Sequence, residues 1–229
     1  MSKKILMVVT SNGQLGSTGG ATGTWLEELA AAYYRFQDSG YTVDIASPSG
    51  GKAPIDPASL EQPWITEQGK RFLADEAAVS QLEHSRKIDS VDGARLDAIF
   101  LVGGAGTAWD FPGSESLRSL VETVDRKGSL VAGVCHGVLG LTTARRADGG
   151  LLVKGRKVTG VSNQEEKLVG YETVVPLLPE TRMNELGALY SSAAQPFGAH
   201  VVRDGNLFTG QNPASAGLLA EAIIGALKS

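Results

Sequence analysis

The sequence predicts a doubly wound α/β sandwich, with a mostly parallel central sheet, helices on both faces and small antiparallel additions. Three short apolar runs, at residues 5–9, 98–102 and 129–134, have the length and composition of strands buried on both faces of a parallel sheet. Between these runs, apolar residues recur at helical spacing. Strands and helices that alternate in this way are typical of a parallel sheet covered on both sides.

The first strand, 5–9, leads into a glycine-rich loop and then into a helix expected from about Thr24. Thr24 and Glu27 have the spacing of a capping box, and Gly40 suits the residue that follows the helix. The next strand is expected at 42–46. The apolar face of the helix is expected to contain Trp25, Leu29, Ala32 and Phe36.

The middle of the chain begins with a proline-rich segment, 48–66, whose apolar side chains favour an ordered excursion over a linker. A helix is expected over 71–82, and a second helix, closed by Gly128, follows the strand at 98–102. Beyond Gly150 the pattern shortens. The elements expected there are strands at 151–153 and 157–161, a helix near 181–186, a hairpin around Asp204 and Gly205, and a closing helix after Pro213.

Composition restricts the class of protein. A chain of 229 residues, 42% hydrophobic and 20% charged, is expected to fold as one globular domain over residues 1–229. No apolar run reaches the roughly 20 residues that a membrane helix needs. The single cysteine excludes an internal disulfide and favours a reducing, cytoplasmic location. The net charge of −4 provides no basic footprint, so we expect no nucleic-acid partner.

The most informative residues surround that cysteine. A buried strand runs into residues 133–137 (GVCHG), which is the strand–turn–helix layout of a nucleophile elbow with sulfur in place of a serine oxygen. The flanking glycines leave room for a sharp turn, and a helix N-terminus favours thiolate over thiol. We therefore expect Cys135 to be a nucleophile with a lowered pKa. The alternative is a buried, unreactive cysteine that packs as a small apolar residue.

Glu28 is the candidate acid. It falls within or beside the apolar stripe of its helix, where a carboxylate is costly unless it is paired, hydrogen-bonded or protonated. A raised pKa would suit it to exchange a proton with a reactive sulfur. Spacing leaves open whether Glu28 is buried or reaches solvent at the edge of the stripe. Glu27 beside it is assigned to the capping box.

The partner of the cysteine is less well defined. His136 follows Cys135 directly, but a neighbour on a sharp turn need not point at the sulfur. Glu165 and Glu166 come just after a predicted strand, and either could orient an imidazole as the third member of a triad. Spacing alone favours a solvated acidic turn for both glutamates.

The loop 103–106 (GGAG) follows a buried strand, so its backbone could approach a ligand and its amides could form half of an oxyanion hole. A tight strand-to-helix turn explains the same glycines, and the two interpretations are compatible. The glycine-rich segment 13–23 lacks a nucleotide-binding motif, and His84 and His200 lack metal-ligand spacing. We therefore expect neither a cofactor nor a metal.

These motifs resemble the PfpI/DJ superfamily, which is class I glutamine amidotransferase-like. The resemblance covers nearly the whole chain and rests on the order of several separated motifs. Besides 133–137, they include Glu28 five residues after Gly23 and the glycine loop at 103–110. The segment 209–215 (TGQNPAS) resembles the final-helix signature of the branch that contains heat-shock chaperones and glyoxalase III.

The resemblance implies a flavodoxin-like fold that is usually assembled as a homodimer. It implies that Cys135 is the nucleophile, that Glu28 hydrogen-bonds the sulfur and that His136 is the partner. Glu166 would match the acid that orients the histidine. Ala105 stands where the glycine loop of the family commonly has histidine, which removes a polar group near the substrate and affects substrate range.

The sequence thus favours a cysteine-dependent, glutathione-independent glyoxalase that converts the small aldehyde methylglyoxal to lactate without a cofactor and protects against reactive carbonyls. The amides of Gly104 and His136 would stabilise the oxyanion. The late His-x-Glu pair of genuine amidotransferases is absent after His200, which disfavours glutamine hydrolysis. Two alternatives stay open. One is a stress-response holdase or oxidation sensor whose Cys135 becomes a sulfinic acid, and the other is an amidase or peptidase for small substrates.

Overall fold

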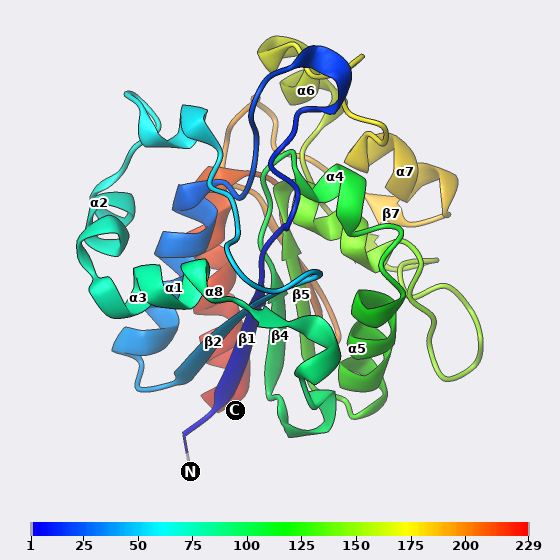
Figure 1. Cartoon of the computed structure of the whole chain (residues 1–229). Coiled ribbons are helices and arrows are strands. Elements are labelled where there is room, and N and C mark those ends of the chain that lie inside the picture. Colours follow the sequence, from blue (N-terminus) through cyan, green and yellow to red (C-terminus); the bar gives the residue numbers. More distant parts are fainter. Residues whose placement is uncertain (1, 229) are drawn as a thin grey trace.

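A seven-stranded sheet forms the centre of the molecule in a computed structural model, which describes residues 2–228 (Figure 1). Met1 and Ser229, the ends of the expected domain, lie outside the described residues. The strands in chain order are β1 (Lys4–Val8), β2 (Thr42–Ser47), β3 (Arg86–Lys87), β4 (Ala98–Leu101), β5 (Leu130–Val134), β6 (Lys157–Val158), β7 (Leu189–Tyr190), β8 (Val201–Asp204) and β9 (Leu207–Gly210). The central sheet has the order β3-β2-β1-β4-β5-β9-β8, in which β8 alone runs antiparallel, and β6 and β7 form a separate parallel pair.

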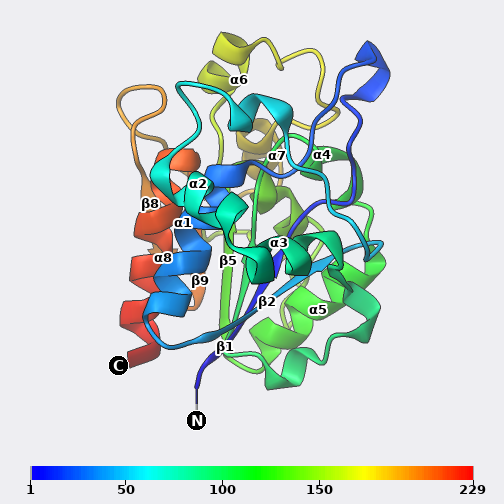
Figure 2. The same ribbon diagram turned by 60° about the vertical axis from the view of Figure 1, so that its left-hand side comes forward.

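Helices cover both faces of this sheet. They are α1 (Leu26–Asp38), α2 (Glu67–Ala74), α3 (Glu76–Glu83), α4 (Thr107–Asp110), α5 (Glu115–Arg126), α6 (Asn163–Val169), α7 (Pro179–Glu185) and α8 (Pro213–Lys228). Helices α1 and α8 lie side by side on one face, whereas α5 lies on the other (Figure 2). The predicted doubly wound α/β sandwich is therefore confirmed.

Strand β1 shows how one segment serves two cores. Successive side chains of a strand point to opposite faces of the sheet. Ile5 and Met7 pack in the core under α1 and α8, whereas Leu6 and Val8 pack in the core under α5. All four are at most 1% exposed, which explains the unbroken apolar run in the sequence.

The order of the strands brings the candidate residues together. Strands β2 and β3 lie on one side of β1, and β4 and β5 lie on the other, so the winding direction reverses between β1 and β4. Ligands of such sheets bind beyond the carboxyl ends of the strands near this point. Leu101 of β4 pairs with Gly133 of β5, so Gly103 and Cys135 both follow at that end of the sheet.

The expected capping box at Thr24 and Glu27 is wrong. Helix α1 begins at Leu26, and its N-cap residue, Trp25, makes no side-chain cap. Thr24 instead forms a parallel bridge with Ile55. Its backbone N–H donates to the carbonyl of Pro54, and its carbonyl accepts from the amide of Asp56. Glu27 accepts a hydrogen bond from Thr66. Tertiary pairing has overridden the local capping signal.

Two other expectations need correction. The single helix expected over 71–82 is divided into α2 and α3, because Asp75 ends the first helix and caps the second by accepting from the amides of Ala77 and Ala78. The strand expected at 151–153 is reduced to an isolated bridge of Leu151 with Arg145, followed by a turn, and that at 157–161 has only two residues in β6. The apolar runs in these two segments indicate burial of the side chains and not the formation of long strands. The hairpin around Asp204 is confirmed as β8 and β9.

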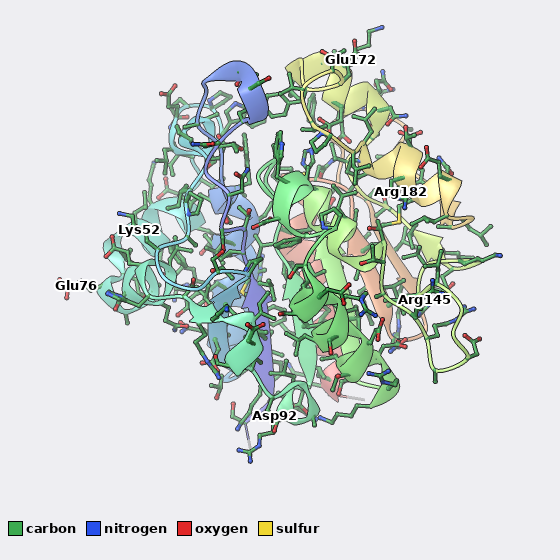
Figure 3. The ribbon with its side chains drawn as sticks, turned by 45° about the vertical axis from the view of Figure 1, so that its right-hand side comes forward. Lys52, Glu76, Asp92, Arg145, Glu172 and Arg182 are labelled. Atoms are coloured by element: carbon green, nitrogen blue, oxygen red, sulfur yellow. The ribbon has the colours of Figure 1, made fainter. Side chains whose placement is uncertain are left out.

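Charged side chains are spread around the surface. Lys52 and Glu76 project on the side of α3, Asp92 lies at the bottom, and Arg145, Arg182 and Glu172 point outward on the opposite side and the top (Figure 3). Side chains of both signs thus occur around the molecule, which carries a net charge of −4. No helix within residues 2–228 combines the length and the apolar character required to cross a membrane.

Phe100 provides a test of how strongly the sheet depends on its helical cover. Its ring packs edge-on against Phe36 of α1, with centroids 5.9 Å apart, and is fully buried. We expect Phe100→Ala to lower the free energy of unfolding by about 3–5 kcal/mol, because it leaves a cavity in the core. Urea unfolding measures this change. Leu218→Ala, at a half-exposed position on α8, should cost about 0.5 kcal/mol or less, and equal losses would contradict the assignment of the core.

Candidate active site

Cys135 occupies a strained turn at the end of β5. It is the first residue of a 3-10 helix, Cys135–Leu141, and its φ of 57° lies in the left-handed region that residues with a side chain rarely adopt. The turn requires a glycine two residues after Cys135, because a Cβ at Gly137 would collide with the carbonyl oxygen of Leu101. The residue is 7% exposed and opens onto a cavity. This is the geometry expected of a nucleophile elbow.

His136 connects the sulfur to a buried carboxylate. Its Nδ1 lies 3.4 Å from Cys135 Sγ, and its Nε2 lies 2.6 Å from Oε1 of Glu166 in α6. The latter contact becomes an ion pair when the imidazole is protonated. Burial lowers the pKa of His136, but Glu166, Glu28 and Asp56 outweigh this effect, so the pKa is raised overall. The imidazole is therefore held between the thiol and an acid.

The two neighbouring glutamates are buried and not in a solvated acidic turn. Glu166 is 0% exposed and contacts His136, whereas Glu165 is 1% exposed and contacts other parts of the chain. Spacing could not show this burial, because Phe197, Gln211 and Asn212 come from distant segments. Glu165 accepts hydrogen bonds from the Ser162 amide and hydroxyl, the Phe197 amide, and the side-chain amides of Gln211 and Asn212.

Glu28 lies in the first turn of α1, fully buried and against the sulfur. The Cys135 thiol and the Gly103 amide contact its carboxyl group, but neither oxygen has a well-directed hydrogen bond. Burial raises the pKa of Glu28 to about 7, an effect that Cys135, His136 and Gly103 partly oppose. A Cβ at Gly103 would collide with Glu28 Oε2 and Cys135 Cβ, so only glycine permits this approach.

The expected lowering of the cysteine pKa is wrong for the resting site. Burial raises the pKa of the Cys135 thiol well above its usual value, and the charges of Glu28 and Glu166 raise it further. The amide of His136, which donates to the sulfur, opposes them only in part. The short 3-10 helix does not outweigh burial. Cys135 is thus a thiol at rest. Protonation of Glu28 removes one of the negative charges that raise the pKa of this thiol.

The glycine loop after β4 supplies unused donors. The carbonyl oxygens of Gly103 and Gly104 accept from Trp25 and Thr107, which fixes the path of the loop. Gly104 has a φ of 105°, so a side chain there would be strained. Within residues 2–228 the amides of Gly104 and Ala105 donate no hydrogen bond, and both residues line the cavity above Cys135. They can therefore donate to an oxygen of a bound molecule.

The cavity has a volume of about 250 Å³. The buried Cys135, His136 and Glu28 line it, together with Gly104 and Ala105 of the glycine loop. The less buried part of its lining, which we call the mouth, contains the aromatic residues Trp25, Trp64, Tyr171 and Phe197. These mouth residues were not among the predicted site residues; the only signal for them was an aromatic residue, Trp64, in the proline-rich segment 48–66. The described residues contain no group of three histidine, cysteine or acidic side chains that could hold a metal ion.

The same arrangement can be compared with known proteins. A family model described as the DJ-1/PfpI family matches residues 21–226. The chain belongs to the DJ-1/PfpI family. One relative in the family, the glutathione-independent glyoxalase HSP31 of Saccharomyces cerevisiae, is 28% identical, and the alignment covers 99% of each chain.

Solved structures share the fold of this chain. The Rapid Encystment Protein 24 KDa (REP24) of Francisella tularensis superimposes with a TM-score of 0.93 at 38% identity, covering 98% of this chain and 99% of the other. Glyoxalase III of Candida albicans superimposes with a TM-score of 0.91 at 28% identity, covering 98% of this chain and 97% of the other. The similarity therefore includes the whole sheet and both layers of helices.

The raised pKa of Glu28 has a consequence for stability. The folded chain holds this proton up to about pH 7, whereas the unfolded chain releases it near 4.5. The associated stability is complete below pH 4.5 and is lost as the pH rises through about 7. We expect the difference in unfolding free energy between the wild type and Glu28→Gln to change by about 3 kcal/mol over this range. Urea unfolding at several pH values measures it, and a difference independent of pH would contradict a buried, protonated Glu28.

Proposed function

We propose that the protein is a cysteine-dependent, glutathione-independent glyoxalase that converts methylglyoxal and water to lactate. The observation that carries this proposal is the contact of one buried thiol, Cys135, with both an imidazole and a carboxyl group whose pKa is about 7. Two relatives of similar length support it by name, the glutathione-independent glyoxalase HSP31 and glyoxalase III. The chemistry follows from the positions of the side chains.

The first step joins the sulfur to the aldehyde carbon. His136 Nδ1, 3.4 Å from the sulfur, takes the thiol proton as the C–S bond forms, and Glu166 stabilises the resulting imidazolium. The aldehyde oxygen becomes negative and takes the proton held by Glu28, which gives a hemithioacetal and leaves Glu28 ionised. The free amides of Gly104 and Ala105 are suited to stabilise this oxygen, since the His136 amide already donates to the sulfur.

The second step moves hydrogen within the substrate. In its ionised form Glu28 removes the proton from the carbon bonded to sulfur, and an enediol forms. Return of a proton to the neighbouring carbon gives a thioester of the hydroxy acid. One carbon is oxidised and the other reduced in the same molecule, so the electrons balance without an added oxidant. A carboxyl group with a pKa of about 7 can both take and return the proton near neutral pH.

The third step releases the product. A water molecule adds to the thioester, the C–S bond breaks, and the sulfur recovers a proton from His136. The carboxylic acid product gives its proton to Glu28 and leaves as lactate, so the site returns to the thiol and the protonated Glu28. Since the carboxyl groups of Glu28 and Glu166 lie in or beside the cavity, they repel the carboxylate product and favour its departure.

We propose in addition that residues 1–229 form one domain that acts as a homodimer in the cytoplasm on a small-molecule aldehyde. The family resemblance supports the homodimer, and the single cysteine suits a reducing compartment. Light scattering of the purified chain tests the homodimer.

Cys135→Ser tests the nucleophile. We expect it to abolish lactate formation from methylglyoxal in the absence of glutathione, with a loss of at least about 1,000-fold, because a hydroxyl in this site is a far weaker nucleophile. Lactate is measured by an enzymatic assay, and circular dichroism confirms the fold. A variant that keeps half of the rate would contradict the proposal. If neither chain forms lactate but both suppress aggregation of a client protein equally, the holdase alternative is supported.

The adjacent glutamates provide a matched comparison of carboxyl groups. We expect Glu28→Gln to lower kcat by about 100-fold or more, because the amide cannot exchange the proton. Glu27→Gln makes the same chemical change one residue away and keeps an acceptor for Thr66, so its rate should stay within about threefold of the wild type. Steady-state kinetics with methylglyoxal measures both variants. Equal losses would mean that the wrong carboxyl group has been assigned.

A further inference from the structure

The mouth of the cavity is an ordered set of aromatic rings. Trp25 and Trp64 meet edge to face, with centroids 5.8 Å apart, and Trp64 lies 6.2 Å from Phe197. Trp64 is 40% and Phe197 39% exposed, and both line the cavity that contains Cys135. These rings therefore present apolar faces to whatever enters the site.

The position of Phe197 is specified by polar contacts beneath it. Its φ of 61° is one of two left-handed values at non-glycine residues within 2–228, and the other belongs to Cys135. The buried carboxylate of Glu165 accepts from the Phe197 amide at 2.8 Å, and the Asn212 side chain donates to the Gly198 carbonyl at 2.8 Å. A strained backbone conformation that is held by hydrogen bonds on both sides fixes the position of Phe197, so its ring is not part of a loose loop.

The charge of the cavity restricts what it can bind. Four carboxyl groups line it, from Glu28, Asp56, Glu165 and Glu166, and within residues 2–228 no lysine or arginine does so. His136 is the single basic side chain in the lining, and it is paired with Glu166. A ligand with its own carboxylate or phosphate would meet repulsion without a compensating cation. The cavity is therefore suited to neutral molecules.

The cavity is also larger than methylglyoxal needs. Its volume of about 250 Å³ lies just below the range, about 300–1,000 Å³, of pockets that enclose drug-sized ligands. The substituent of methylglyoxal is a single methyl group, which would leave the aromatic mouth without a partner. A ring in that place would bury apolar surface against Trp64 and Phe197.

We infer that the preferred substrate is a neutral α-oxoaldehyde with a large apolar, aromatic substituent. Its aldehyde carbon meets Cys135, and its ring packs against Trp64 and Phe197. This inference rests on the proposed glyoxalase chemistry, which stays the same: an aryl-substituted oxoaldehyde and water give the corresponding 2-hydroxy acid. Trp64 and Phe197 thus determine specificity, and Cys135, His136 and Glu28 perform the reaction.

Phenylglyoxal and methylglyoxal test the inference as a pair. In the wild type, kcat/KM for conversion of phenylglyoxal to mandelate should exceed that for methylglyoxal to lactate by about tenfold or more. Trp64→Ala and Phe197→Ala should each lower this ratio by about tenfold, since each removes apolar contact with the ring. The ratio between substrates cancels effects of a variant on the shared chemistry.

Leu189→Ala is the control. Leu189 is exposed on β7 and is not part of the cavity lining, so the variant should keep both rates and their ratio. A ratio that stays unchanged in Trp64→Ala and Phe197→Ala, with methylglyoxal still converted, would overturn the inference and leave the proposed function intact. Thermal unfolding of each variant confirms that it is folded.

A binding measurement separates the two proposals if no aldehyde is converted. Acetophenone has the ring and one carbonyl group but no aldehyde, so it probes the mouth without reaction. Calorimetric titration should show that it binds the wild type at least about tenfold more tightly than Trp64→Ala does. That result without turnover would refute the glyoxalase and keep the aromatic specificity, whereas equal affinities would refute the specificity itself.

Discussion

The left-handed backbone of Cys135 is the constraint around which the site is arranged. A residue with a side chain pays of order 1–3 kcal/mol to hold such a conformation, so the surroundings must enforce it. Here the pairing of β4 with β5 fixes the strand that enters the turn, and the 3-10 helix Cys135–Leu141 follows it directly. The same turn leaves so little room that Gly103 and Gly137 cannot carry a Cβ. The sulfur can then lie between His136 and Glu28.

A second constraint is electrostatic. The site buries two carboxyl groups and one imidazole beside a thiol, and it includes no lysine or arginine to neutralise them. Isolated buried charges are costly, so such a site keeps protons where water would remove them. Glu28 accordingly holds its proton up to about pH 7, and the thiol also resists ionisation. Reactivity in this environment comes from proton transfer among neighbours and not from a permanent thiolate.

Local signals in the sequence were sufficient for the sheet and the elbow. Strands buried on both faces, such as β1 and β4, appear in the sequence as unbroken apolar runs. The glycines of residues 133–137 predict the sharp turn. Features that depend on distant segments were not accessible. Thr24 pairs with Ile55, so its capping pattern was misleading. Glu165 and Glu166 look like an acidic turn until the loops around Phe197 and Asn212 close over them.

The chain places its reaction chemistry and its mouth on different kinds of structure. Cys135 and the glycine loop end central strands, whereas Trp64 and Phe197 belong to connecting loops, the parts of a fold that tolerate replacement best. A lineage could therefore exchange the rings at the mouth, and with them the molecules admitted, while every atom that breaks or forms a bond stays in place. The hydrogen bonds of Glu165 set a limit on this freedom, because they anchor one of these loops to the end of α6 that also carries Glu166. Evolution of substrate range in this scaffold is thus easier through side chains than through loop length.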